Sequence, residues 1–305
     1  MSIARAAEIL HAGGLVVFPT ETVYGLGGDA ANPRAVARIF EAKGRPRLNP
    51  LIAHVPDLAE ADRHAHLHPK ARTLAERFWP GPLTLVAPRR ADSSVAELAC
   101  AGLATIALRA PAHPMARELL AAFGKPIAAP SANRSGQVSA TTAQLAAADL
   151  GDRVDLVLDA GPCPIGLEST IVAIADDGAA TLLRAGAVAR ADIEALVGPL
   201  GVPQRDAVSA PGMLESHYAP RARLRLDAAA PRAGEAYLAF GAPAAPNGLT
   251  LSASGDLVEA AANLYACLRA LDASGANAIA VAPIPAHGLG EAIRDRLARA
   301  AAPRR

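Results

Sequence analysis

Short apolar runs rich in β-branched residues alternate with helix-length segments through the first two-thirds of this 305-residue chain. Strands separated by helices of about ten residues indicate an α/β domain. The strand candidates are 15–18, 50–55, 83–88, 105–111, 126–130, 154–161, 169–174 and 181–186. Helical patterns between several of them are PRAVARIFEAKG, HPKARTLAERFW, HPMARELLAAFG and TTAQLAAADLG. A first helix is predicted between an N-cap at Ser2 and a stop at Gly13. The order of the strands in the sheet cannot be read from this alternation.

The pattern changes near residue 200. Residues 201–222 contain three prolines and little periodicity, which is typical of a linker or a functional loop. Strand and helix patterns then resume, with helices predicted over about 256–272 and 288–302. We therefore expect a first domain over 1–200, a linker over 201–220 and a smaller α/β domain over 221–305.

Composition narrows the classes of function. The net charge is +1 and aromatic residues are 3%, so a basic site must be local and a base-stacking surface is not expected. The three cysteines are Cys100, Cys163 and Cys267, so their number is odd, and their spacing is not that of a zinc site. Both observations favour a reducing cytoplasmic compartment and no structural metal. The N-terminus does not resemble a signal peptide, and no apolar run reaches the ~20 residues of a membrane helix.

The stretch FPTETVYGLGGDA, residues 18–30, ends a strand candidate at Pro19. Thr20, Glu21 and Thr22 follow, and then three glycines. Read alone, it predicts a strand that ends in a glycine turn; read beside the other polar segments, it predicts one wall of a site. Thr22 is then the hydroxyl expected to face a ligand, with Thr20 and Glu21 fixing the turn. A one-residue shift in the strand end would re-aim both threonines.

The segment FEAKGRPRLNPLIAH places Lys43, Arg45 and Arg47 between a helix and a strand. Alternate residues of an extended loop project to one side, so these three cations are expected to converge, as suits a polyphosphate. Asn49 and His54 add an amide and an imidazole. The alternative is a solvated basic turn. No GxxxxGK[ST] motif occurs, so a nucleotide site here would not be a Walker loop.

Two other loops carry small polar groups. PIAAPSANRSGQVSATT offers Ser131, Asn133 and Ser139 before a predicted helix, an arrangement that favours anions, although a serine-rich loop with an ordinary N-cap explains it equally well. GPCPIGLESTIVAI enters a strand through Glu168 and Ser169, and is a weak signal by itself.

Two arginines lie in otherwise apolar strands, Arg109 in TIALRAP and Arg184 in TLLRAG. A buried charge is costly unless it is paired or faces a ligand, so both are site candidates. Thr105 shares a face with Arg109 by strand alternation. No Ser-His-Asp arrangement is evident, which leaves positioning and charge neutralisation as the expected chemistry.

Taken together and in order, these segments resemble the YrdC-like family of threonylcarbamoyl-AMP synthases, in its long form with a C-terminal domain. The resemblance runs through FPTETVYGLG, IFEAKGRPRLNPL, WPGPLTLV, TIALRAP, APSANRSGQVS, GLESTIV, LLRAG, SAPGMLESHYAP and LGEAIRDRLARAA, nearly the whole chain. The family's Lys-x-Arg and Ser-x-Asn signature is present as Lys43 with Arg45 and Ser131 with Asn133.

The resemblance implies an enzyme that joins L-threonine, bicarbonate and ATP into threonylcarbamoyl-adenylate and pyrophosphate. A separate complex would then transfer the threonylcarbamoyl group to tRNA. It also implies a YrdC-like twisted open sheet around a deep cavity and a Rossmann-like C-terminal domain.

The resemblance also implies roles for individual residues. Threonine would contact Thr22, His54, Arg109, Ala129 and Ser169. ATP would contact Arg45, Asn49, Thr105, Ser131, Asn133, Ser139, Arg184 and Tyr218, with Lys43 and Arg45 as the catalytic cations. Mg²⁺ is expected with ATP, held by phosphate oxygens and water rather than by a protein carboxylate cage. SAPGMLESHYAP is expected to fold back as a lid that brings Tyr218 to the nucleotide and excludes water.

Three positions depart from the common pattern of the family: Ala173 after STIV, Ala185 after LLR, and Leu214 to Ser216 where many relatives are basic. There are two alternatives. One is a double-stranded RNA-binding protein that uses the basic concave surface, although the near-zero net charge speaks against this as the main role; its weaker form is RNA binding beside an enzymatic activity. The other is carbamoyl transfer in hydrogenase maturation, whose proteins also carry zinc-finger cysteine pairs and an acylphosphatase-like segment, and this sequence shows neither feature.

Overall fold

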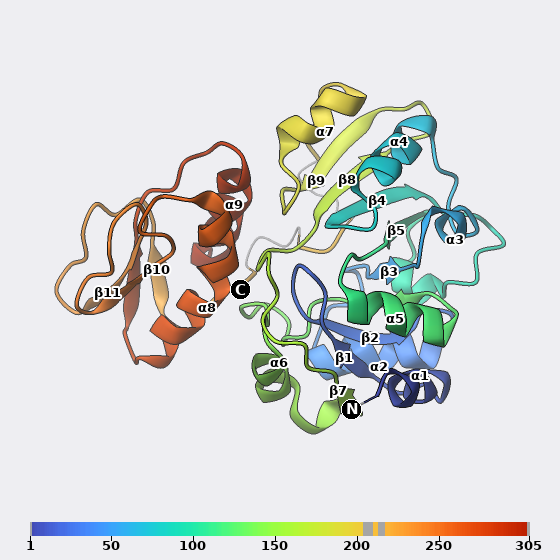
Figure 1. The fold of residues 1–305 in the computed structure, drawn as a ribbon, viewed down its shortest axis with the longest axis horizontal. Helices are drawn as coiled ribbons and strands as arrows, with labels where there is room; N and C mark the ends of the chain where they lie inside the picture. Colours follow the sequence, from blue (N-terminus) through green and yellow to red (C-terminus); the bar gives the residue numbers. More distant parts are fainter. Residues whose placement is uncertain (1, 204–209, 213–216, 304–305) are drawn as a thin grey trace.

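The structure, a computed structural model, describes residues 2–203, 210–212 and 217–303 (Figure 1). Within these residues the strands form two sheets, a nine-stranded sheet in the larger N-terminal part and a four-stranded sheet in the smaller C-terminal part. The two sheets and their helices make the mixed α/β architecture predicted from the alternating pattern.

The nine-stranded sheet mixes parallel and antiparallel neighbours. Its strands, in spatial order, are β7 (Leu156–Val157), β1 (Val16–Phe18), β2 (Gly25–Asp29), β6 (Ile127–Ala128), β3 (Ile52–His54), β5 (Thr105–Arg109), β4 (Leu83–Pro88), β8 (Thr170–Ile174) and β9 (Ala180–Arg184). β1 with β7, β3 with β5 and β4 with β8 are parallel pairs, and the other neighbours are antiparallel. Each predicted strand candidate contains one of these strands, except that β9 begins one residue before its candidate at 181–186.

Helices accompany the nine-stranded sheet, most of them where the sequence pattern predicts. They are α1 (Ile3–His11), α2 (Pro33–Lys43), α3 (Leu58–Asp62), α4 (Pro69–Phe78), α5 (Pro114–Phe123), α6 (Ala143–Leu150) and α7 (Arg190–Val197), with short 3₁₀ turns at Glu97–Cys100 and Gly151–Arg153. The Ser2 hydroxyl accepts a hydrogen bond from the Arg5 amide, as predicted, and Gly13 follows the end of α1 with φ 80°. The short α3 carries no periodic signal and is not predicted.

The glycines of the opening stretch are strand residues, and the prediction of a glycine turn there is wrong. Gly25–Asp29 forms β2, which pairs antiparallel with β1 and with β6. A Cβ atom on Gly27 would lie 2.8 Å from the Phe18 ring and 2.9 Å from Ile127. Glycine therefore lets two large side chains close over the backbone of a buried strand.

The C-terminal sheet is all parallel, with the order β10 (Arg223–Arg225), β13 (Ala278–Val281), β11 (Glu235–Ala239) and β12 (Gly248–Thr250). Helices α8 (Leu257–Ala273) and α9 (Leu289–Ala301) accompany it, and Asp256 caps α8 through the Val258 amide. This is the Rossmann-like arrangement that the resemblance implies.

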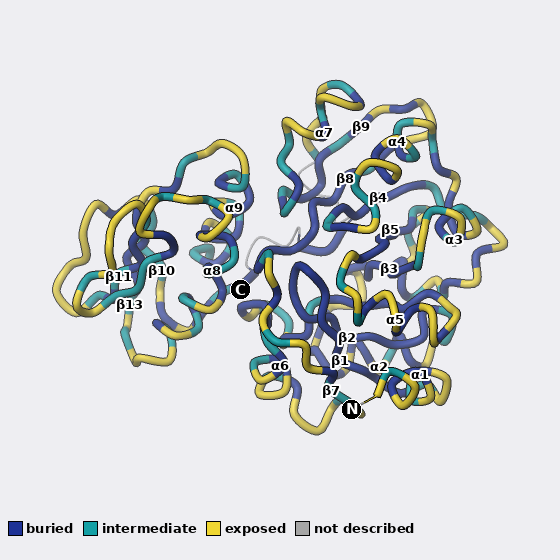
Figure 2. Tube along the Cα trace, in the orientation of Figure 1, coloured by how far each residue is buried: buried dark blue, intermediate teal, exposed yellow. Residues whose placement is uncertain are grey.

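The two parts meet through α8 and α9, which lie on the side of the C-terminal sheet that faces the larger part (Figure 1). One apolar cluster crosses the boundary and joins Val23 and Leu167 to Leu264 and Tyr265 of α8. Figure 2 shows buried chain along this boundary and exposed loops on the far side of β11. The boundary is therefore part of the protein interior.

Candidate functional site

A narrow cavity lies on one face of the nine-stranded sheet, between the ends of several strands. The lining residues are Thr20, Thr22, Val23, Tyr24, Gly25, Arg45, Ile52, His54, Arg109, Ala129, Pro130, Ser131, Glu168, Ser169, Arg184, Pro211, Gly212, His217 and Tyr218. Ile52 and His54 point to the same face of β3, as alternate strand residues do. The enclosed volume is about 40 Å³. Ligand pockets usually measure ~300–1,000 Å³, so the cavity as it stands is smaller than a nucleotide.

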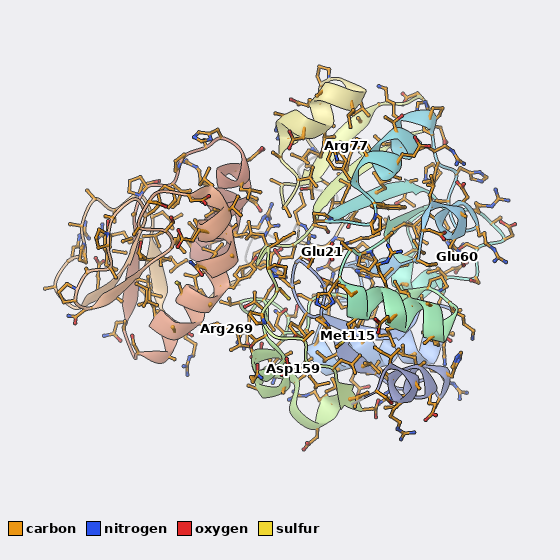
Figure 3. The ribbon with its side chains drawn as sticks, viewed as in Figure 1. Glu21, Glu60, Arg77, Met115, Asp159 and Arg269 are labelled. Atoms are coloured by element: carbon orange, nitrogen blue, oxygen red, sulfur yellow. The ribbon has the colours of Figure 1, made fainter. Side chains whose placement is uncertain are left out.

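Arg109 and the threonines of the opening stretch form one wall. The Arg109 guanidinium donates to Glu21 Oε1 at 2.5 Å, to Thr22 Oγ1 at 3.0 Å and to the Gly81 carbonyl at 3.2 Å. Burial by itself would raise the pKa of Glu21, but the charge and hydrogen bond of Arg109 outweigh it and lower that pKa. Figure 3 places Glu21 in the middle of the larger part.

The pairing of Arg109 with Glu21 changes the roles expected of these two residues, whereas Thr20 keeps its expected role. Arg109 already has a buried carboxylate partner, so its burial does not depend on a ligand. Three of its five N–H groups are used, which leaves two for a ligand. Thr20 fixes the turn as predicted, because its hydroxyl donates to the Val23 carbonyl at 2.7 Å and accepts from the Val23 amide at 3.2 Å. Glu21 instead holds Arg109 and accepts from the Ala112 amide.

His54 is a neutral group on the same wall. Desolvation, helped by the Arg109 charge, lowers its pKa to about 3. Its ring meets Phe18 edge-on at 6.1 Å between centroids, and its Nδ1 atom has no hydrogen-bond partner among the described residues. A buried ring nitrogen without a partner is a group that a ligand can satisfy. Ala129 also lines the cavity, where its side chain offers only a methyl group.

The basic loop after α2 does not bring its three cations together, and that prediction is wrong for Arg47. A turn with the Asn49 amide bonded to the Pro46 carbonyl interrupts the extended chain, so Arg47 is exposed while Arg45 is buried. Arg45 donates to the Asn49 carbonyl at 3.0 Å, to Asn49 Oδ1 at 2.7 Å and to the Pro50 carbonyl at 2.8 Å. Desolvation lowers the pKa of Arg45 to about 9, so it stays charged at neutral pH.

Lys43 is buried behind the cavity wall. Its ammonium donates to the Ser131 carbonyl at 2.6 Å and to the Asn133 carbonyl. Desolvation lowers its pKa well below the ordinary value. Lys43 thus braces the loop that carries Ser131, and the Lys-x-Arg and Ser-x-Asn motifs are in direct contact.

Arg184 joins two sides of the cavity. It donates to the Ser169 carbonyl at 2.9 Å, to the Ser169 hydroxyl at 3.1 Å and to the Pro211 carbonyl at 3.1 Å. The Ser169 hydroxyl lies 2.7 Å from that of Thr84 on β4. Desolvation lowers the pKa of Arg184.

Five of the predicted residues lie outside the cavity wall: Lys43, Asn49, Thr105, Asn133 and Ser139. Asn49 and Ser139 each contact a lining residue, Arg45 and Glu168 respectively. Thr105 begins β5, the strand that ends with Arg109. Beside the cavity lies an apolar floor of Ile52, Val86, Ala107, Ile171 and Leu183, on which Ala210 packs.

The linker contributes Pro211, Gly212, His217 and Tyr218 to the wall, whereas residues 204–209 and 213–216, including the departures at Leu214 to Ser216, lie outside the described residues. Tyr218 is 1% exposed, has φ 61° and stacks on Tyr265 at 5.8 Å between centroids. Desolvation lowers the pKa of His217 to about 3, and its Nδ1 also lacks a described partner.

Sequence reasoning did not assign a ligand role to His217 or Glu168, both of which line the cavity. His217 is the neighbour of Tyr218, whose contact with ATP was predicted, so its position in the sequence could have indicated a place on the cavity wall. Glu168 accepts from Ser139 at 2.6 Å, from Tyr265 at 2.7 Å and from Arg296 at 2.8 Å. Two of these partners are about a hundred residues away in the sequence, so no local pattern indicates them.

The charges around the cavity favour an anion. Arg45 and Arg184 form no salt bridge with any described carboxylate, and their hydrogen bonds go to neutral oxygens. A buried cation without a salt bridge is costly, and a bound anion reduces that cost. The Glu168 charge offsets part of the cost for Arg184 without a direct salt bridge. Fold and site together define an α/β protein with a cavity at its sheet whose lining of guanidinium, imidazole and hydroxyl groups suits an anion.

Comparison with known proteins identifies the family. The family model described as "Telomere recombination" matches residues 8–186, and the model described as "Threonylcarbamoyl-AMP synthase, C-terminal domain" matches residues 188–302. The threonylcarbamoyl-AMP synthase of Bacillus subtilis is 40% identical, over 98% of this chain and 92% of that protein. The protein of the same name from Pyrococcus abyssi is 39% identical, over 98% and 93%.

Solved structures agree with this. Pyrococcus abyssi Sua5 complexed with L-threonine matches with a TM-score of 0.90 at 37% identity, covering 98% of this chain and 94% of that one. The chain belongs to the threonylcarbamoyl-AMP synthase family and is an enzyme of the nucleotidyltransferase kind. The comparisons do not favour the RNA-binding alternative. None of the described helices has the length and apolar character needed to cross a membrane.

Proposed function

We propose that this enzyme condenses L-threonine, bicarbonate and ATP into threonylcarbamoyl-AMP and pyrophosphate, for transfer by a separate complex to tRNA. The observation that carries the proposal is the pair of buried guanidiniums, Arg45 and Arg184, which face one cavity with only neutral hydrogen-bond partners. A triphosphate is the substrate that such a pair suits, because guanidinium forks match phosphate oxygens.

The nucleotide half of the cavity is assigned to Arg45, Arg184, Ser131 and Tyr218. We assign the apolar floor on which Ala210 packs, together with Thr105 on the same strand as Ala107, to the rest of the nucleotide. Asn49 and Ser139 act from behind by holding the lining residues Arg45 and Glu168, and the Asn133 carbonyl accepts a hydrogen bond from Lys43. Lys43 supplies positive charge and fixes the Ser131 loop.

The threonine half is assigned to Thr22, His54, Arg109, Ala129 and Ser169. The two free N–H groups of Arg109 suit the carboxylate of an amino acid. The Thr22 and Ser169 hydroxyls and the unpartnered His54 Nδ1 suit its amino and hydroxyl groups. The crystal structure of the Pyrococcus abyssi relative is a complex with L-threonine, which supports threonine as the amino acid.

The chemistry needs no side-chain nucleophile. In the proposed first step the threonine nitrogen attacks the carbon of CO₂, or of bicarbonate with loss of hydroxide, to form a carbamate and release a proton. A carbamate oxygen then attacks the α-phosphorus, and the bond from that phosphorus to the bridging oxygen breaks to release pyrophosphate. Arg45 and Arg184 would stabilise the charge that moves onto the leaving group.

Mg²⁺ is proposed to enter with ATP. The one carboxylate on the described cavity wall, Glu168, is already bonded to Ser139, Tyr265 and Arg296. The donor set therefore fits a metal held by phosphate oxygens and water, which would neutralise part of the triphosphate charge.

The linker is proposed to move during the cycle. Its described residues Pro211, Gly212, His217 and Tyr218 enclose a cavity of about 40 Å³, too small for ATP. We infer that they withdraw to admit substrates and return to exclude water. Location in the cytoplasm stays a prediction, made from the cysteine pattern. The domain boundaries at 200 and 220 also stay predictions, made from the change in sequence pattern there.

The test is pyrophosphate release with ATP, threonine and bicarbonate supplied together and with each omitted. The proposal expects release only with all three. Release that is undiminished without threonine would contradict it, and so would no release from an enzyme shown to bind ATP. Salt-dependent RNA binding without turnover would instead support the RNA-binding alternative.

A further inference from the structure

A buried polar cluster lies where the two parts of the protein meet, and we call Glu168, Tyr218, Tyr265 and Arg296 the Glu168 cluster. Arg296 and Tyr265 are 0% exposed. The Glu168 carboxylate accepts from the Tyr265 hydroxyl at 2.7 Å and from Arg296 Nε at 2.8 Å. The Arg296 guanidinium lies 5.0 Å from the centre of the Tyr218 ring.

The four members come from four different segments. Glu168 precedes β8 in the larger part, and Tyr218 belongs to the linker. Tyr265 lies on α8 and Arg296 on α9, the two helices that face the larger part (Figure 1). The C-terminal helices thus contact two residues of a cavity wall that the larger part and the linker build.

Two members of the Glu168 cluster, Glu168 and Tyr218, line the cavity wall. Glu168 also receives the Ser139 hydroxyl at 2.6 Å and precedes Ser169, to which Arg184 is bonded. Arg296 additionally donates to the Ala185 carbonyl at 2.9 Å, one residue beyond Arg184. A displacement of Arg296 would therefore reach several groups assigned to the nucleotide.

The contact at this boundary is too close to be a loose docking of two modules. A Cβ atom on Gly166, which has φ +71°, would lie 2.6 Å from the Ala262 carbonyl of α8. Backbone thus meets backbone two residues before Glu168. Glu168 and Arg296 also form a buried ion pair at this boundary. Burial by itself would raise the pKa of Glu168, but Arg296 and the other favourable interactions lower it to about 2.

We propose that Tyr265 and Arg296 are positioning residues for the nucleotide half of the site, which act by holding Glu168 and Tyr218 in place. The C-terminal helices are then a working part of the catalytic site rather than an appended module. This inference rests on the proposed function for the identity of the nucleotide, and it names residues that never touch the reacting atoms.

The chain offers a matched control on the same helix. Glu291 of α9 also crosses the boundary, where it accepts from Arg190 of α7 at 2.7 Å and 3.1 Å. That ion pair does not contact the cavity wall. Leu297, the neighbour of Arg296, is a second control: it is 3% exposed in the apolar cluster and makes no polar contact with Glu168.

The experiment compares Tyr265→Phe, Arg296→Gln and Arg296→Lys with Glu291→Gln and Leu297→Ala. ATP affinity is measured by direct titration, and KM and kcat are measured for ATP and for threonine. Melting temperatures sort the variants by stability. Tyr265→Phe removes one hydroxyl only and should fold even where Arg296→Gln does not.

We expect ATP affinity to fall roughly 10-fold or more in Arg296→Gln and several-fold in Tyr265→Phe, with partial recovery in Arg296→Lys. The KM for threonine should change less than the KM for ATP. Glu291→Gln should match the wild type, and Leu297→Ala should lose stability while it keeps ATP affinity.

Unchanged ATP affinity in Tyr265→Phe and in a folded Arg296 variant would overturn the inference. Equal losses in Leu297→Ala would also overturn it, since they would show a merely structural role. A wild type that binds ATP but makes no pyrophosphate would overturn the proposed function alone, because the affinity comparison does not depend on turnover.

Discussion

Arg45 and Arg47 offer a direct test of which cations meet the nucleotide. They are two residues apart in KGRPR, yet Arg45 is buried on the cavity wall and Arg47 is exposed. Methionine at either position keeps an unbranched apolar stem and removes the charge. Arg45→Met is therefore the perturbation and Arg47→Met its matched control.

The magnitude follows from the donors that Arg45 has left. Three of its hydrogen bonds, from Nε and Nη2, go to Asn49 and Pro50, so the two N–H groups of Nη1 stay available. Hydrogen bonds from a charged donor contribute about 1.5–3 kcal/mol each. Losing this charge and its two free donors should weaken ATP binding by about 3–6 kcal/mol, roughly 100-fold or more.

The assay is calorimetric titration of ATP into each variant, with a melting temperature as the check on folding. Arg47→Met should bind ATP within about two-fold of the wild type, because an exposed cation is screened by solvent and salt. The reasoning would be refuted if a folded Arg45→Met bound ATP normally, or if the two variants lost affinity equally.

Other parts of the structure support three further predictions. Replacing Glu21 and Arg109 together by Gln, which avoids an orphaned buried charge, should weaken threonine binding by about 10-fold or more while ATP titrates as in the wild type; unchanged threonine binding would contradict the assignment. Because His54 and His217 have pKa values of about 3 in the folded protein, below the ordinary 6.5, the unfolded chain takes up protons first as the pH falls. Urea unfolding should thus show stability falling from pH 6.5 downward by up to ~1.4 kcal/mol per pH unit for each imidazole, and His54→Gln should flatten that slope. Gly27→Ala should lower the free energy of unfolding by ~1–3 kcal/mol through contact with Phe18, and a neutral result would show that β2 can shift.

Local chemistry made much of the fold predictable. Ser2 caps the first helix as predicted, and Asp256 caps α8 where a helix was predicted to begin, because a cap depends on the few residues that follow it. The β-branched runs became strands for a similarly local reason, since alternation and side-chain shape act within each run. Strand order depends on contacts between distant runs, so it needed the structure.

The failures are equally physical. Gly25–Asp29 carries almost no side chains, so it shows no periodicity, yet its bare backbone is what lets Phe18 and Ile127 pack over β2. The predicted convergence of Arg47 assumed an extended loop, and a turn closed by the Asn49 amide redirects it. Both errors arise where backbone geometry, rather than side-chain pattern, determines the local structure.

The site was predicted mainly through motif resemblance, and the structure adds its supporting layer. Arg109 and Arg184 were marked by their charge in apolar strands, a signal available from residues alone. Some of the partners that fix the wall residues are remote: Glu21 is 88 residues from Arg109, and Arg296 is 128 residues from Glu168. Long-range pairs of this kind leave no trace in local spacing.

The central claim is that one cavity joins threonine to AMP through a carbon taken from bicarbonate. Mass spectrometry of the product made with ¹³C-bicarbonate tests it directly. We expect a threonylcarbamoyl-adenylate that carries one heavy carbon and disappears when threonine is omitted. An unlabelled threonyl-adenylate, or an adenylate formed equally without bicarbonate, would contradict it.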